Sequence, residues 1–129
     1  MVSGFLALLL LGIADFGNGF WTQMQVGAAA RAGAEEAARN GYNSATIQTA
    51  ETNATSLRGM TAGTPSEFCG CANGTSGIAV AACSTTCTSG ETAGTYVTVT
   101  AQASYTTIFH WPGLNDPLTL ASSVTVRLN

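Results

Sequence analysis

The sequence contains no lysine, and charged residues make up only 9% of its 129 residues. An ordinary soluble domain carries roughly 25% charged residues. Four scattered arginines supply the strongly basic groups, and the net charge is −3. So few cations exclude the basic surface on which nucleic-acid-binding proteins depend, and we expect no nucleic-acid partner. A surface with so little charge indicates a subunit that neighbours largely cover, or one that works outside the cytosol.

Proline is also absent from the first half of the sequence, so nothing there forces a break in a helix. An apolar run leads into a stretch rich in Ala, Gln, Glu and Arg, which are good helix formers. Glu35 and Arg39 lie one turn apart and can form an ion pair, and Asn40 and Gly41 are a typical helix stop. The pattern predicts one helix of about forty residues, roughly 60 Å long. Because a globule of this size does not need such a helix, we expect its N-terminal half to project.

The projecting half begins with an apolar segment at residues 1–14, which we interpret as the membrane anchor and assembly segment. Its run of about thirteen residues is shorter than the roughly twenty needed to cross a bilayer. No basic segment or small-residue cleavage site flanks it, so we expect either that the run itself directs export or that a leader has been removed. The residues assigned to the membrane and assembly surface are Phe5, Leu8, Leu9, Leu11, Ile13, Asp15, Phe16, Phe20 and Trp21.

Asp15 follows the apolar segment directly, and two hypotheses account for it. In the first, Asp15 marks the boundary between membrane and water, with Phe20 and Trp21 as interfacial aromatic residues. In the second, Asp15 becomes buried on assembly and pairs with a cation of a neighbouring subunit, either an α-amino group or Arg31. Both can hold in turn, one before assembly and one after it.

Small residues dominate the following helical segment, 27–38, apart from its charged positions. Helix propensity alone can account for them. Alternatively, small residues let neighbouring helices pack with their backbones close together. The residues assigned to such packing are Gly27, Ala30, Arg31, Gly33 and Ala34.

A second, shorter helix is predicted at about 44–58, with Asn43 or Ser44 as its N-cap and Gly59 near its end. Beyond the cysteine segment the period of apolar residues changes to two, which predicts strands at about 95–109 and 118–128. We therefore expect an α+β fold with a long helix, a short helix and a small antiparallel sheet.

The chain divides into two parts in this interpretation. Residues 1–41 form the long N-terminal helix, and residues 42–129 form a globular domain that packs on it. The connection between the two strands contains two prolines, a glycine and an asparagine, and is predicted to be a turn.

All four cysteines of the chain lie in the segment 69–87, at Cys69, Cys71, Cys83 and Cys87. A metal site is the alternative to disulfides, but zinc sites usually have C-x2–4-C spacing, and exported chains rarely keep four free thiolates. We favour disulfides and an oxidising compartment. A bond between Cys69 and Cys71 would close a very tight ring, so each pairs with a later cysteine. For a hairpin, the nested pairs Cys69–Cys87 and Cys71–Cys83 fit better than the crossed ones.

The sequence offers no catalytic constellation and no cofactor motif. His110 is the single histidine and lies in the predicted turn without a nucleophile pattern near it. Glu35 and Glu36 are adjacent on a helix and therefore point in different directions. We expect no enzyme activity, no cofactor and no metal.

Three motifs in order carry a resemblance to a known family. They are the D-F-G sequence at 15–17, the aromatic pair at 20–21 and the A-R-A-G-A element at 30–34. With the apolar segment before them, they closely resemble the N-terminal signature of TadE-like pseudopilins, the minor pilins of bacterial tight-adherence (Tad) pili. The cysteine segment and the closing strand are also similar to that family.

The resemblance implies a type IV pilin-like subunit, which prepilin peptidase would process and the inner membrane would hold. The pilus assembly machinery would then build it, with related pilin subunits, into an extracellular filament that serves adhesion. Family members usually carry a glutamate upstream of the apolar run, whereas no acid precedes Asp15 here, so no residue is assigned as the processing site. The alternative function is a membrane-tethered binding module for a surface ligand or glycan.

Overall fold

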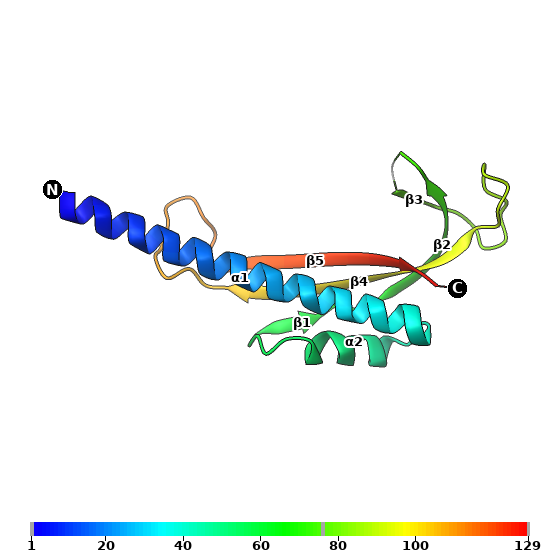
Figure 1. Cartoon of the computed structure of the whole chain (residues 1–129), viewed down its shortest axis with the longest axis horizontal. Coiled ribbons are helices and arrows are strands. Elements are labelled where there is room, and N and C mark those ends of the chain that lie inside the picture. Colours follow the sequence, from blue (N-terminus) through cyan, green and yellow to red (C-terminus); the bar gives the residue numbers. More distant parts are fainter. Residues whose placement is uncertain (1, 76, 129) are drawn as a thin grey trace.

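The computed structural model describes residues 2–75 and 77–128. Two helices are followed by five strands, which together form an elongated molecule (Figure 1). The α+β class predicted from the sequence is confirmed. The elements are α1 (Val2–Asn40), α2 (Ser44–Asn53), β1 (Met60–Ala62), β2 (Ser66–Asn73), β3 (Gly77–Val80), β4 (Gly94–Tyr105) and β5 (Leu118–Arg127).

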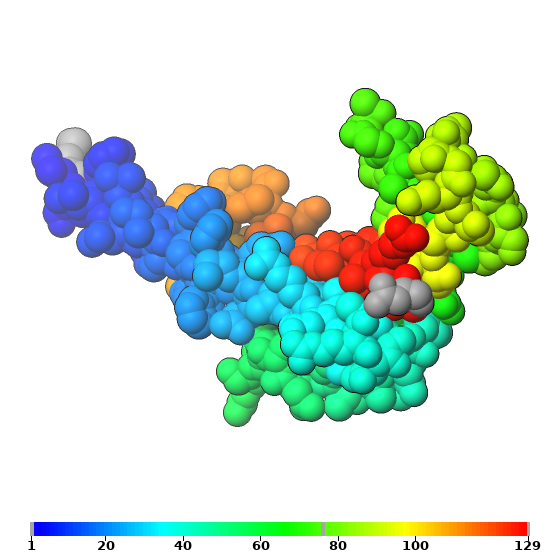
Figure 2. Space-filling view, turned by 45° about the vertical axis from the view of Figure 1, so that its right-hand side comes forward, coloured from blue at the N-terminus to red at the C-terminus, as the bar shows by residue number. Residues whose placement is uncertain are grey.

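The long helix α1 has 39 residues, close to the predicted forty. It ends where expected, since Gly41 takes a positive φ of 81° and its N–H donates to the carbonyl of Ala37 at 2.9 Å. The predicted ion pair between Glu35 and Arg39 forms on the exposed face. The N-terminal part of α1 extends beyond the body of the molecule (Figures 1 and 2).

The sheet is antiparallel and is organised around β4, its longest strand. One edge of β4 pairs with β5 over ten residue pairs, from Tyr96 opposite Arg127 to Tyr105 opposite Leu118. Its other edge pairs with β1 and then with β2, and β2 continues into a hairpin with β3. The hairpin lies at the end of the molecule opposite the N-terminus (Figure 1).

The core lies between the C-terminal half of α1 and one face of the sheet. Alternate residues of β4, among them Val97, Val99, Ala101 and Ala103, are buried there, as the period of two predicts. The buried residues form two clusters along the helix, and each contains residues from both sides of position 41. The buried apolar residues of the two helices are Val26, Ala29, Ala30, Ala34, Ala37 and Ile47.

The small residues of α1 allow a close approach within the chain, against α2 and β4. At Gly33, a Cβ atom would lie 2.6 Å from Cγ of Glu51 and 2.8 Å from Cγ1 of Val99. Ala30 and Ala34 are buried beside it, whereas Arg31 is exposed. Of the residues assigned to helix packing, those that are buried thus contact this chain's own elements, and Gly27 is only partly buried.

The helix α2 is shorter than the predicted range 44–58. Asn43 caps it as expected, accepting two backbone hydrogen bonds from the first turn. The chain leaves the helix early because the hydroxyl of Thr55 donates to Gln25 of α1 at 2.8 Å and accepts from the N–H of Leu57 at 3.1 Å. This turn lets Leu57 pack against the core.

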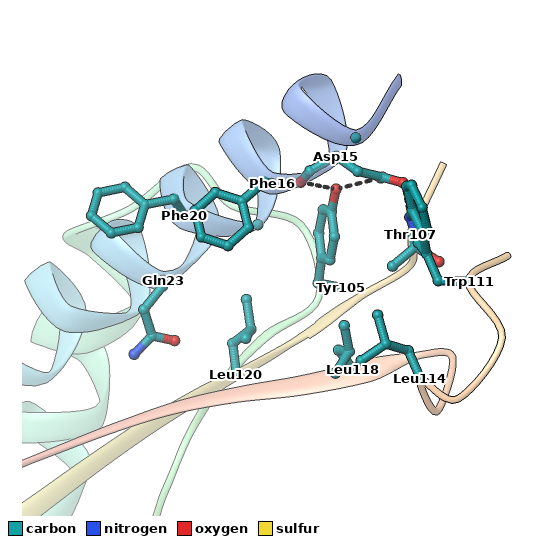
Figure 3. A pocket seen from close by; sticks show the side chains of 12 residues that line it. Asp15, Phe16, Phe20, Gln23, Tyr105, Thr107, Trp111, Leu114, Leu118 and Leu120 are labelled. Atoms are coloured by element: carbon teal, nitrogen blue, oxygen red, sulfur yellow. Dashed lines mark hydrogen bonds between the residues drawn. The ribbon is translucent and has the colours of Figure 1, made fainter. Parts of the chain in front are cut away.

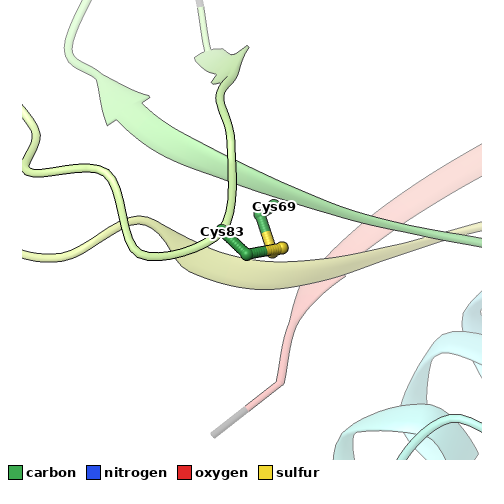
Figure 4. The surroundings of a disulfide bond; sticks show 2 residues. All are labelled: Cys69 and Cys83. Carbon is green, nitrogen blue, oxygen red and sulfur yellow. A yellow bond between two sulfur atoms is a disulfide. The ribbon is translucent and has the colours of Figure 1, made fainter.

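The two disulfides join Cys69 to Cys83, which Figure 4 shows, and Cys71 to Cys87, with Cα–Cα distances of 5.1 and 5.6 Å. The predicted nested pairing is therefore wrong, and the pairs are crossed. The prediction assumed one hairpin through the segment, but the structure has strands β2 and β3 there and then a second reversal at Ser84, whose φ is 79°. After this reversal the chain pairs with the segment that leads into β4, at Thr86 opposite Thr92, and Cys87 bonds to Cys71 from there.

Glu51 of α2 is fully buried in this packing. Neither carboxylate oxygen has a hydrogen-bond partner among the described residues. Burial without compensation disfavours the charged form, and it raises the pKa of Glu51 to about 7. Because this value lies above the ordinary 4.5, the folded state binds an extra proton between these two pH values.

We expect the free energy of unfolding to fall as the pH rises from about 4.5 to about 7 and to stay level above that range. Glu51→Gln removes the titrating group. The free energy of unfolding of Glu51→Gln minus that of the native chain should therefore be larger at pH 8 than at pH 4, by roughly 1–3 kcal/mol. Urea unfolding of the detergent-solubilised chain at both pH values measures this. Glu91→Gln, at an exposed position, is the control. Parallel pH profiles of the native chain and Glu51→Gln would contradict the prediction.

Candidate functional site

The segment after β4 does not continue as a strand. The predicted strand 95–109 is too long, because β4 ends at Tyr105 and residues 106–117 form a loop, the β4–β5 loop, that lies beside α1 (Figure 1). The loop reaches far along the helix. A Cβ atom at Gly12 would lie 3.5 Å from Cη2 of Trp111. The indole ring therefore lies against α1 at Gly12, close enough that a Cβ there would make an ordinary van der Waals contact with it.

Asp15 fastens this loop to α1. Its Oδ1 atom accepts hydrogen bonds from the N–H of Ile108 at 2.6 Å and from the hydroxyl of Tyr105 at 3.1 Å. Its Oδ2 atom accepts from the N–H of Phe109 and from Nε1 of Trp111, both at 3.0 Å. In Figure 3 the Tyr105 and Trp111 side chains both point toward Asp15. Three N–H groups donate to the carboxylate, and the single proton of the Tyr105 hydroxyl is shared between Oδ1 and the carbonyl oxygen of Asp15, which lies at 3.0 Å.

These bonds explain why the strand ends where it does. The N–H groups of Ile108 and Phe109, which would continue the sheet ladder, are bound to a side chain instead. Asp15 itself is only 6% exposed although it lies near the outer part of the helix. It is also the single charged residue that precedes Arg31 in the sequence. The structure thus gives Asp15 partners within its own chain, which neither sequence hypothesis included.

A second carboxylate, Asp116, supports the loop from within. It accepts a hydrogen bond from the N–H of Thr107 at 3.3 Å and lies 3.3 Å from Nδ1 of His110. The His110 side chain is otherwise exposed. The single histidine of the chain therefore helps to shape the loop.

An apolar groove of about 480 Å³ lies between α1, the β4–β5 loop and β5 (Figure 3). A second hollow, of about 660 Å³, continues along α1 toward its N-terminus and shares Gly12, Phe16 and Trp111 with the first. Both are walled almost entirely by apolar groups. Besides Asp15, Tyr105 and Trp111, the side chains that line the groove are Phe16, Phe20, Gln23, Thr107, Leu114, Leu118 and Leu120.

The residues assigned to the membrane and assembly surface are exposed in the structure, with Asp15 as the exception. Three further apolar residues missed by the sequence interpretation, Ile108, Phe109 and Leu114, are exposed on the β4–β5 loop. The composition of the loop was the available signal, because a simple solvent-exposed turn seldom carries this many large apolar residues. The assigned residues that are exposed are Phe5, Leu8, Leu9, Leu11, Ile13, Phe16, Phe20 and Trp21.

Over residues 2–75 and 77–128, no cluster of three or more His, Cys, Asp or Glu side chains is placed to hold a metal ion. The four cysteines are all used in disulfides. What the site does offer is a large apolar surface and one fastened loop, an arrangement that suits association better than chemistry.

Replacing Asp15 by Asn should release the β4–β5 loop. The amide keeps one acceptor oxygen, but its NH₂ group faces donors, so at least one backbone N–H loses its partner. We expect the amide hydrogens of Ile108 and Phe109 to exchange with solvent several-fold faster in Asp15→Asn, measured by hydrogen–deuterium exchange in detergent.

The matched control is Asn18→Ala, since Asn18 lies one turn along the same helix and is exposed. Its exchange pattern in the loop should equal that of the native chain. Unchanged protection of both amides in Asp15→Asn would show that Asp15 does not fasten the loop.

By its length and composition, the helix α1 is long and apolar enough to cross a membrane. No curated protein and no solved structure matches the chain. Residues 1–35 match the family model described as TadE-like protein. The match confirms the resemblance to the TadE-like family over the segment that holds the apolar half of α1 and Asp15.

Proposed function

We propose that this chain is a structural subunit of a Tad or type IV-like surface pilus that assembles through the N-terminal half of α1. The observation that carries the proposal is the unpartnered apolar surface of that half. Its large side chains are exposed, Phe5 by 65%, Ile13 by 68% and Phe16 by 79%. The family match covers this same segment.

Such a surface needs cover, because monomeric soluble proteins rarely expose large contiguous apolar patches. Burying one Leu or Phe side chain contributes about 1.5–3 kcal/mol. Several such residues per subunit are enough to hold a polymer together without covalent links. Before assembly the inner membrane covers the helix, and afterwards the helices of sister subunits cover it. Prepilin peptidase and the assembly machinery act between these two states.

The remainder of the chain suits the outside of a filament. It is tied by two disulfides, which persist in oxidising compartments. The β2–β3 hairpin lies at the end of the molecule opposite the N-terminus (Figure 1). In a filament with α1 inside, this end would face outward and would be available for attachment to a surface.

A charged residue on the projecting helix should block this route. Arginine near the centre of a membrane-crossing helix costs roughly 2.5–3.5 kcal/mol, so Leu9→Arg should greatly lower both the membrane-bound amount and the amount in sheared filaments. The matched control is Val80→Arg, because Val80 is 77% exposed on the distal hairpin. It should leave both amounts unchanged. Immunoblots of the membrane and filament fractions, with electron microscopy of the filaments, measure the outcome.

Complete absence of the native chain from sheared filaments would contradict the pilus proposal. If the chain nevertheless stays in the membrane fraction, the result would favour a membrane-tethered binding module instead.

A further inference from the structure

We infer that the β4–β5 loop is a lipid-contacting element that sinks, with α1, into the leaflet on the side of the globular part. The partner is the upper acyl and glycerol region of a bilayer. This inference rests on the membrane-held state in the proposed function and extends it to a second segment, far away in the sequence. Four side chains carry the contact, namely Ile108, Phe109, Trp111 and Leu114.

The place of the loop along the helix puts it beside the apolar run. That run continues to Ala14, and Asp15 follows it. Trp111 lies against Gly12, three residues or about 4.5 Å before Asp15 at 1.5 Å per residue. A membrane that covers the apolar run therefore reaches the loop near the end of that run, at the level of the glycerol and the upper acyl chains.

The chemistry of the loop fits that depth. Ile108 is 60% exposed and Leu114 50%, so they present apolar surface that nothing in the described chain covers. Phe109 packs edge-on against Trp111, with 5.1 Å between the ring centres. Trp and other aromatic residues favour the interface of a membrane. The exposed His110 adds a polar side chain to the loop.

Four backbone N–H groups of the loop are hydrogen-bonded within the chain, which lowers the cost of moving the loop out of water. Irregular segments in lipid carry a cost of several kcal/mol for each unsatisfied N–H group. Asp15 accepts from the N–H groups of Ile108 and Phe109, and Asp116 accepts from that of Thr107. The N–H of Leu114 donates to the carbonyl of Trp111 at 3.2 Å. Asp15 is accordingly a positioning residue, which occupies the N–H groups of Ile108 and Phe109 as the loop enters lipid.

Lipid is favoured over a second copy as the first cover because helix and loop present one continuous apolar surface. The groove and the second hollow share Gly12, Phe16 and Trp111, so they join α1 to the loop without a polar break. Any solvent that covers the helix at this level therefore meets the loop as well. The nearest cation along α1, Arg31, lies about 24 Å beyond Asp15 at 1.5 Å per residue.

Tryptophan fluorescence tests the inference, since Trp21 and Trp111 are the two tryptophans of the chain. The variant Trp21→Phe leaves Trp111 as the sole probe. The full-length chain is reconstituted in phosphatidylcholine vesicles whose acyl chains are brominated either near the glycerol or near the chain ends. We expect strong quenching of Trp111 by lipids brominated near the glycerol, and acrylamide quenching several-fold weaker than that of the urea-unfolded chain.

A second probe reports the helix separately. The triple variant Trp21→Phe, Trp111→Phe and Leu9→Trp places the only tryptophan on the exposed face of the projecting helix. If this probe is quenched by bromine while Trp111 is quenched only by acrylamide, the helix is inserted and the inference about the loop fails. If the brominated lipids quench neither probe, the membrane-held state of the proposed function is contradicted too. If Trp111 is shielded from both quenchers, a second copy covers it, which also overturns the lipid assignment.

The positioning role of Asp15 has its own readout in the same vesicles. In the Trp21→Phe background, Asp15→Asn should increase acrylamide quenching of Trp111 several-fold, whereas Asn18→Ala should leave it unchanged. Equal quenching in all three proteins would overturn the positioning role.

Discussion

The hydrogen bonds between the Asp15 carboxylate and the β4–β5 loop determine how the outer half of this molecule is built. A buried carboxylate needs donors, and a loop that leaves a sheet needs acceptors for its free N–H groups. Here the two requirements satisfy each other, because the N–H groups of Ile108 and Phe109 donate to the Asp15 carboxylate at 2.6 and 3.0 Å. The loop is thereby held along α1 at the level of Gly12, and both the apolar groove and the exposed loop residues follow from that placement.

The same helix serves two different kinds of packing along its length. In its C-terminal half, tiny side chains let the sheet and α2 approach so closely that a methyl group at Gly33 would meet both Glu51 and Val99. In its N-terminal half, large side chains such as Phe5 and Ile13 are left without cover. The change from small to large residues along one helix therefore separates a surface that is buried on folding from one that is buried by an external partner.

Local patterns predicted the parts of the fold that depend on local physics. Helix propensity and the absence of proline gave α1, and the period of two gave β4 and β5 to within a few residues. The crossed disulfides were missed because they depend on a second reversal of the chain at Ser84. The fastening of Asp15 was missed because its partners, Tyr105 and Trp111 among them, lie about ninety residues away. Long-range backbone donors leave no periodic signal in a sequence.

The identity of residue 15 follows from the number and kind of donors around it. An apolar side chain would leave the two loop N–H groups and the indole N–H without acceptors, which is costly in any medium that excludes water. A basic side chain has no acceptor to offer, and asparagine offers one oxygen where two are used. Glutamate would move the carboxylate outward by one methylene group and lose the present distances. Aspartate alone supplies two oxygens close to the helix axis. An acid can therefore follow an apolar run here, because the loop donors satisfy its carboxylate without water.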